Sequence, residues 1–123
     1  MAIHCYNCVL CNGAVEESMF HLFFTCQFSE VCWEYLGIVW NTTAQPTDMV
    51  IEAKQNFGSS AFREIMITGC WGIWCHRNAI IFDSAGISLV TWKATFREEL
   101  SNTIIRAKPS LKAFLNPWLC NLN

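Results

Sequence analysis

The chain has 123 residues, which is enough for one compact domain or two very small modules and too few for a multilayer catalytic fold. Hydrophobic residues make up 53% and charged residues 15%, which excludes an intrinsically disordered chain and predicts that some apolar surface faces a partner. The net charge of -2 is unevenly spread. Residues 1–60 hold one basic and six acidic residues, or -5, whereas residues 61–123 hold seven basic and four acidic residues, or +3.

The N-terminal sequence predicts a reducing compartment. Residues 1–8 have no basic segment, no long apolar stretch and no small-residue cleavage site, so they do not resemble a secretory signal. We therefore expect an intracellular protein, in the cytoplasm or nucleus, whose eight cysteines do not form a disulfide scaffold. The longest nearly uncharged apolar stretch, residues 65–75, is about half of the roughly 20 residues that a bilayer requires, so we expect no contact with a membrane.

The first motif along the chain has the spacing of a metal site. Cys8 and Cys11 are two residues apart, and His21 and Cys26 follow after a nine-residue spacer. Three thiolates and one imidazole are ligands that tetrahedral zinc prefers, and a two-residue gap lets both sulfurs of a tight turn face one ion. His21 and Cys26 lie about one helical turn apart, so both can approach the same ion. The sequence predicts a zinc-binding module over residues 1–40.

Other arrangements of these cysteines stay open at this point. Cys5 and Cys8 form an equally spaced pair that overlaps the first, and Cys32 competes with Cys26 for the fourth position. The simplest alternative is a set of free cysteines that lie close together in an apolar chain. We favour Cys8, Cys11, His21 and Cys26 because they enclose a loop of ordinary length for a zinc site.

The rest of the chain is predicted to be helical. Within residues 17–40, Phe20, Phe24, Val31 and Tyr35 can share one helical stripe, which predicts one or two short helices. Residues 41–60 are polar and rich in turn residues, so they are interpreted as a linker with at most a short helical turn. Residues 61–123 form the third region, a helical region with a C-terminal tail.

Two amphipathic helices are expected within residues 61–123, joined by a break at residues 83–86 and packed as an antiparallel hairpin. Pro109 and Pro117 are expected to end regular structure. The overall fold class is therefore mainly α, with a small zinc-stapled Cys-Cys-His-Cys module followed by an amphipathic helical hairpin. The faces expected to be buried are Phe62, Ile65, Met66, Gly69, Cys70, Ile73, Trp74, Arg77 and Ile81 in the first helix, and Leu89, Trp92, Phe96, Leu100 and Ile104 in the second.

Two interpretations are weighed for each of Trp71, Trp74 and Arg77 in the first helix. Trp71 and Trp74 are expected in the core, because they lie in the most apolar run, rather than as stacking platforms for bases. Arg77 is expected to lay its stem along the core with its head in water, rather than to reach a phosphate or a carboxylate of another domain. Asn78 is expected to cap or turn the helix end near Asp83.

Beyond spacing, residues 8–33 resemble a known family. The Cys8–Cys11 pair, the run Glu-Ser-Met-Phe-His-Leu-Phe-Phe-Thr-Cys over residues 17–26, and Trp33 resemble the zinc-binding domain near the C-terminus of plant non-LTR (LINE-type) retrotransposon reverse transcriptases. Residues 71–82 resemble the Trp-x-Ile-Trp-x-x-Arg-Asn-x-x-Ile-Phe segment that commonly follows it. The resemblance implies a zinc cofactor, a nucleic-acid context and a parent polyprotein whose reverse transcriptase domain is a partner.

Catalysis is not expected from this chain. A polymerase of that family needs paired aspartates that hold two magnesium ions, and the chain has only Asp48 and Asp83, which are far apart in sequence. The same shortage of carboxylates argues against a nuclease centre. We therefore expect a non-catalytic zinc-binding fragment.

Two roles for the zinc stay open. In the first, the module assists binding to RNA or DNA, although no Lys or Arg precedes Lys54 and phosphate contacts supply most of such affinity, so binding alone should be weak. In the second, zinc is a structural staple and the aromatic surface docks on the polymerase. A decayed fragment with no independent function is a further alternative. The candidate nucleic-acid contacts are Lys93, Arg97, Arg106, Lys108 and Lys112.

Overall fold

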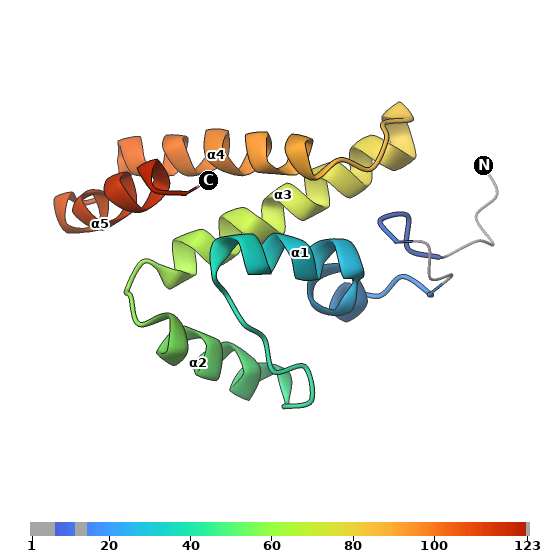
Figure 1. Ribbon diagram of the computed structural model, residues 1–123, viewed down its shortest axis with the longest axis horizontal. Coiled ribbons are helices and arrows are strands. Elements are labelled where there is room, and N and C mark those ends of the chain that lie inside the picture. Colours follow the sequence, from blue (N-terminus) through green and yellow to red (C-terminus); the bar gives the residue numbers. More distant parts are fainter. Residues whose placement is uncertain (1–6, 12–14, 123) are drawn as a thin grey trace.

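The computed structural model describes residues 7–11 and 15–122, and these residues are mainly helical (Figure 1). Within this part of the chain the only extended pairing is an isolated antiparallel bridge between Asn7 and Glu16. The mainly α fold class is thus confirmed. The helices are the π-helix η1 (His21–Thr25) and the α-helices α1 (Gln27–Leu36), α2 (Pro46–Phe57), α3 (Phe62–Asp83), α4 (Leu89–Arg106) and α5 (Pro109–Cys120).

The helices α3 and α4 form the predicted hairpin, and α4 runs back along α3 in Figure 1. Helix α3 ends at Asp83, and the next residue, Ser84, has a left-handed φ of 57°. Helix α4 begins after Ser88, whose hydroxyl accepts a hydrogen bond from the Thr91 N–H and so satisfies one free donor of the first turn. The buried face of α4 consists of four of the predicted residues, Trp92, Phe96, Leu100 and Ile104, whereas Leu89, which was also expected there, is only partly buried.

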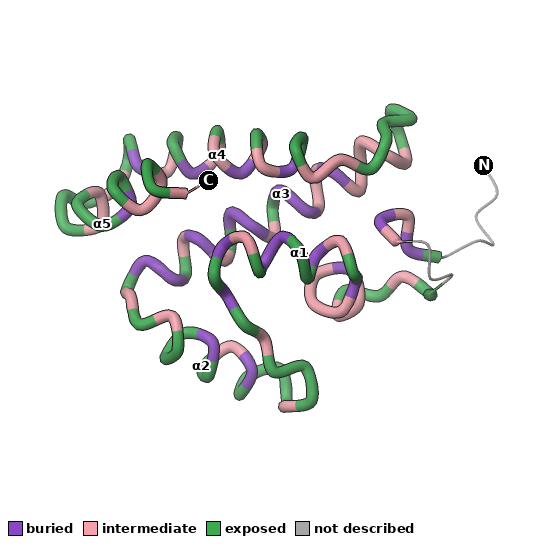
Figure 2. The backbone as a smooth tube through the Cα atoms, in the orientation of Figure 1, coloured by how far each residue is buried: buried purple, intermediate pink, exposed green. Residues whose placement is uncertain are grey.

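Two glycines let α3 contact indole rings from two other helices. A Cβ atom at Gly69 would lie 2.8 Å from the ring of Trp33 in α1, and one at Gly72 would lie 2.8 Å from Nε1 of Trp92 in α4. Both distances are shorter than any contact that a Cβ atom normally makes with a neighbouring ring, so only glycine permits this packing. The Trp92 N–H also donates to the Gly69 carbonyl at 3.3 Å. Helix α3 is therefore the central element (Figure 2).

The buried face of α3 differs from the predicted one. Thr68, Gly72 and His76 are buried. The residues that were expected to be buried but are only partly so are Met66, Cys70, Trp74, Arg77 and Ile81. Trp71 was expected in the core, but half of its surface is exposed. Because α3 carries apolar residues all round, hydrophobicity alone does not define which side faces inward.

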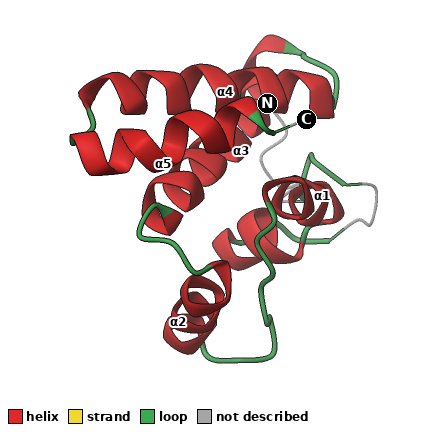
Figure 3. Ribbon diagram, turned by 60° about the vertical axis from the view of Figure 1, so that its left-hand side comes forward, coloured by secondary structure: helices red, strands yellow, loops and turns green. Residues whose placement is uncertain are grey.

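The expected linker, residues 41–60, contains the complete helix α2, so the prediction of at most a short helical turn was wrong. Pro46 occupies the first turn, where its missing N–H costs nothing, and Gly58 ends the helix with a φ of 74°. Met49 and Ala53, one helical turn apart, are buried. Figure 3 shows α2 on the opposite side of the molecule from α4 and α5.

The prediction that two prolines end regular structure was also wrong. Pro109 begins α5 instead of ending a helix, and Pro117 lies inside the last turns of α5. Pro109 lies in the first turn, where its missing N–H costs no hydrogen bond, whereas Pro117 removes one helical hydrogen bond but does not end α5. Leu115 is fully buried, and the Trp118 ring contacts Phe96 at a centroid distance of 6.1 Å.

The single stripe expected over residues 17–40 is interrupted. Cys26 has an extended backbone, with ψ of 134°, and separates η1 from α1. Phe20 and Phe24 do lie together, with ring centroids 5.6 Å apart, but Val31 is 42% exposed. The residues that face inward instead are Leu22, Ser29, Cys32, Trp33 and Leu36. Among the described helices none is long and apolar enough to cross a membrane.

Candidate metal centre

The four predicted ligands come from three consecutive local structures. Cys8 and Cys11 lie in a tight loop, which is closed by a hydrogen bond from the Cys8 N–H to the Val15 carbonyl at 2.8 Å. His21 is the first residue of η1, and Cys26 is the residue between η1 and α1. The Cys26 N–H donates to the His21 carbonyl at 2.7 Å, so the backbone itself fixes the spacing of this second pair.

The structure brings these four side chains together. The ligand atoms of Cys8, Cys11, His21 and Cys26 all lie within 4.8 Å of one another. The Sγ atoms of Cys8 and Cys26 are 3.8 Å apart, and Cys11 Sγ is 3.4 Å from His21 Nε2. In a zinc tetrahedron, bonds of about 2.3 Å to sulfur and about 2.0 Å to nitrogen give edges of about 3.8 Å and about 3.5 Å. The cluster can therefore hold a tetrahedral metal ion with little rearrangement.

Thr25 orients the histidine ligand. Its hydroxyl oxygen lies 3.0 Å from His21 Nδ1, which leaves Nε2 facing the sulfur atoms. A partner on the second ring nitrogen fixes the ring orientation of a metal-binding histidine. The His21 N–H also donates to the Ser18 hydroxyl at 3.0 Å. Sequence analysis did not identify Thr25, although its position four residues after His21 on a helix was the available signal.

Burial differs among the ligands. Cys8 and Cys26 are 4% and 0% exposed, whereas Cys11 and His21 are partly exposed. Burial raises the pKa of the Cys8 thiol to about 12 and also raises the pKa of Cys26. Thiolates at these two positions therefore need a nearby positive charge, which a bound metal ion supplies.

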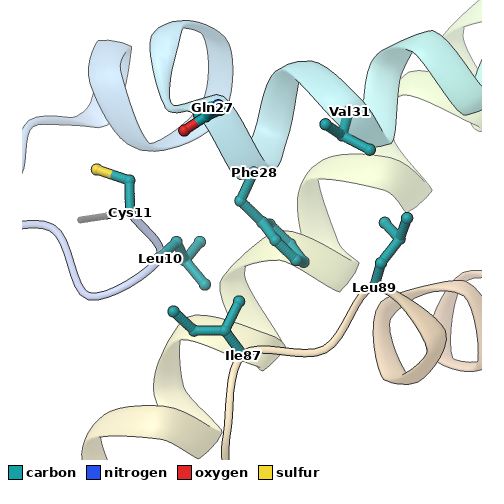
Figure 4. A pocket seen from close by; sticks show the side chains of 7 residues that line it. All are labelled: Leu10, Cys11, Gln27, Phe28, Val31, Ile87 and Leu89. Atoms are coloured by element: carbon teal, nitrogen blue, oxygen red, sulfur yellow. The ribbon is translucent and has the colours of Figure 1, made fainter. Parts of the chain in front are cut away.

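Cys11 borders a pocket of about 490 Å³ between the metal-site loop, α1 and the start of α4. Figure 4 shows the Cys11 sulfur at one end and the apolar side chains of Leu10, Phe28, Ile87 and Leu89 around the centre. Of the four ligands, Cys11 and His21 are the ones that are partly exposed to solvent.

The competing cysteine Cys32 takes no part in this cluster. Cys32 is fully buried within α1 and is not one of the clustered residues. Burial raises the pKa of its thiol. Cys5 lies outside the described residues. Among the described residues, the favoured ligands are thus the ones whose side chains lie close together, namely Cys8, Cys11, His21 and Cys26.

An ion pair attaches the metal module, which comprises residues 7–11 and 15–36, to α3. The guanidinium of Arg77 donates from Nε and one terminal nitrogen to the two carboxylate oxygens of Glu17, at 2.6 Å and 2.9 Å. It also donates to Asn78 Oδ1 at 2.8 Å and lies over the Trp74 ring, 4.8 Å from its centroid. This hydrogen bonding raises the pKa of Arg77. The expectation that its head lies in water, and that Asn78 caps the helix, was wrong.

The five candidate nucleic-acid contacts do not form one surface. The Arg97 guanidinium donates to the Tyr35 hydroxyl at 3.2 Å and to the carbonyls of Leu119 and Leu122. Lys93 Nζ lies over the Tyr35 ring, 4.2 Å from its centroid. These two cations are engaged within the fold. The remaining candidates lie where α4 meets α5: Arg106 and Lys108 are exposed, and Lys112 is partly exposed.

Comparisons of the chain with models of protein families, with curated protein sequences and with solved structures found no match. The geometry of the site and the residues of the motif are therefore the basis for any functional conclusion.

Proposed function

We propose that the chain is a non-catalytic zinc-binding module in which the metal acts as a structural staple. The observation that carries this proposal is the convergence of three sulfur atoms and one imidazole nitrogen within 4.8 Å of one another, with the Cys8–Cys26 and Cys11–His21 distances close to the edges of a zinc tetrahedron. Four protein ligands of this type characterise structural zinc sites, whereas catalytic sites keep one position for water. Soft thiolate ligands favour zinc over magnesium or calcium.

The position of the site explains why a staple is useful. In its described residues, the segment that supplies Cys8 and Cys11 has one isolated backbone bridge, between Asn7 and Glu16, and a bound metal ion would add side-chain links to this pairing. A metal ion joins this loop to both ends of η1. Through the Glu17–Arg77 ion pair, the same module is attached to α3. Small domains with limited cores commonly rely on a metal in this way.

We further propose that the module docks on a larger protein, which the sequence resemblance assigns to the reverse transcriptase of a retrotransposon. The support is an apolar surface formed by η1 and α3. Ile67 and Trp71 are each 50% exposed there. The residues of this surface, termed the α3 apolar patch, are Phe23, Met66, Ile67, Cys70, Trp71 and Trp74. An exposed patch of large apolar side chains is typical of an interaction surface.

Contact with RNA or DNA is the second candidate function. The observation that favours it is the outward position of Arg106 and Lys108 beside Lys112 at the α4–α5 junction. If this junction binds single-stranded RNA, changing all three to Gln should remove a salt-dependent shift in a titration, whereas Arg97→Gln should act only through stability. An unchanged titration of the triple variant would contradict a role for these residues.

Native mass spectrometry of protein purified under reducing conditions tests the metal proposal. We expect one zinc ion per chain, and we expect Cys11→Ser and His21→Ala each to abolish or strongly weaken its retention. Cys120→Ser is the matched control, because Cys120 is exposed and lies outside the cluster. Retention of zinc in both ligand variants, or the absence of zinc from the unmodified protein, would contradict the proposal.

A further inference from the structure

A second pocket, apart from the four metal ligands, is lined by residues of η1, α1 and the segment that connects α1 to α2. Figure 1 shows how α1 and this connecting segment run. The pocket has a volume of about 280 Å³. Three aromatic side chains, Phe24, Trp33 and Trp40, form part of its wall. The Trp40 ring packs against the other two, with centroid distances of 5.0 Å to Phe24 and 5.4 Å to Trp33. These edge-to-face contacts hold the wall in a fixed shape.

Two carboxylates line the same pocket. Glu30 and Glu34 lie one turn apart on α1, and both are exposed. Neither makes an ion pair with any residue in the part of the chain that the structure describes. Like charges at this spacing on a helix repel each other, so a cation placed between them would be favoured. The half of the sequence that supplies the pocket residues, 1–60, carries a net charge of -5, which further favours a cationic ligand.

We propose that this acidic aromatic pocket binds a Lys or Arg side chain of a partner protein. The apolar stem of such a side chain packs against the aromatic wall while its charged head lies between Glu30 and Glu34. Long basic side chains have both parts, and a guanidinium or ammonium gains from aromatic as well as carboxylate contacts. A small hydrated metal ion would use only the carboxylates, and a phosphate group would be repelled.

A failure of the pocket proposal can be distinguished from a failure of the metal proposal. Phe24 belongs to η1, and the Trp33 N–H donates to the Phe23 carbonyl at 2.6 Å, so the aromatic wall depends on a folded module. The inference goes beyond the proposed staple, and it is tested on protein whose metal content has first been measured by native mass spectrometry. Trp40 is the natural reporter, because its indole N–H is buried and has no acceptor among the described residues.

The experiment follows the Trp40 indole N–H resonance during titration with short peptides, with the resonance assigned by a Trp40→Phe variant. The probes are acetyl-Gly-Arg-Gly-amide, acetyl-Gly-Lys-Gly-amide and the neutral acetyl-Gly-Gln-Gly-amide. We expect a saturable shift with the two cationic peptides and none with the neutral one. The double variant Glu30→Gln, Glu34→Gln should weaken binding about tenfold, as expected for the loss of two partly screened charge contacts.

A matched control is Glu98→Gln, which removes an exposed carboxylate from α4 outside the pocket and should leave the titration unchanged. Three results would overturn the proposal: equal binding of the neutral peptide, no shift with any peptide, or unaltered binding by the double variant. Butylguanidinium is the last probe: it carries only the stem and charged head of an arginine side chain, so it should bind about as tightly as the Arg peptide, because the proposed contacts are made by the side chain alone.

Discussion

In the helical hairpin of α3 and α4, buried apolar side chains supply the stability. Trp92, Phe96 and Leu100 are fully buried against α3, and their spacing along α4 places them on one face. In the metal module, residues 7–11 and 15–36, several buried positions are instead occupied by polar or metal-binding groups, including Cys8, Cys26 and Ser29. One region is an apolar interface between two long helices, and in the other an apolar core that includes Leu22 and Trp33 lies beside the candidate metal ligands. The two regions should therefore respond differently to the same perturbation.

Removal of the metal should give the largest effect. We expect a chelator to abolish amide hydrogen-exchange protection in the metal module, while α3 and α4 keep theirs, because metal binding supplies about 10 kcal/mol or more in small zinc modules. Hydrogen exchange read out by mass spectrometry checks this. Equal loss of protection in both regions would contradict the comparison, as would full protection of the module without metal.

The opposite perturbation removes packing from the hairpin. Leu100→Ala should lower the free energy of unfolding by about 3 kcal/mol, because Leu100 is fully buried and the change leaves a cavity. Urea denaturation of the metal-loaded protein measures this. Ile105→Ala, at a position that is 71% exposed on the same helix, should change stability by only a few tenths of a kcal/mol. We expect both variants to retain one zinc ion per chain.

The junction between the two regions gives a smaller effect. Gly69→Ala places a methyl group 2.8 Å from the Trp33 ring, which should cost more than the helix gains from alanine and leave a net loss of about 1 to 2 kcal/mol. Gly86→Ala is the control, because no heavy atom lies within 4 Å of a Cβ there. Equal stability of the two variants in urea would show that α1 adjusts without strain.

The ion pair at the same junction should contribute less. Arg77→Gln leaves the Glu17 carboxylate without its bidentate partner, and both side chains are 19% exposed. We expect a loss of about 1 kcal/mol and faster hydrogen exchange in the segment that contains Glu17. Arg63→Gln, an exposed change on the same helix, should have no measurable effect. An unchanged exchange rate in Arg77→Gln would mean that the ion pair does not hold the module.

The metal site and the face of α4 were predictable because each depends on local spacing. Two cysteines in one turn, and a histidine and a cysteine one helical turn apart, meet almost regardless of the rest of the fold. The repeat of Trp92, Phe96, Leu100 and Ile104 likewise defines a single side of a helix. In such cases a short stretch of sequence contains all the information that the structure uses.

The features that sequence analysis missed depend on contacts between distant segments. Glu17 and Arg77 are 60 residues apart, and neither position indicates the other. The two prolines of α5 were interpreted as helix ends, although a proline in the first turn is equally typical of a helix start. Trp71 was placed in the core because it lies in an apolar run, but a helix that is apolar all round must turn one side outward.

His76 is another buried residue that spacing did not identify, and it should give the smallest effect. It is 4% exposed, its Nε2 accepts a hydrogen bond from the Ser88 N–H at 3.0 Å, and its ring stacks on Phe28. Burial lowers the pKa of His76. The unfolded chain therefore binds a proton more readily, so His76 contributes stability above the usual histidine pKa of about 6.5, and this contribution is lost as the pH falls below that value.

Comparison with His76→Gln isolates this contribution, because glutamine can still accept the Ser88 N–H but does not titrate. We expect the free energy of unfolding to fall more in the unmodified protein than in the variant between pH 7.5 and pH 5.5. Metal ligands also take up protons in acid, but they do so in both proteins, so their effect cancels in the difference. If both lose the same stability, His76 titrates normally, and the α3–α4 junction is more open to water than its burial indicates.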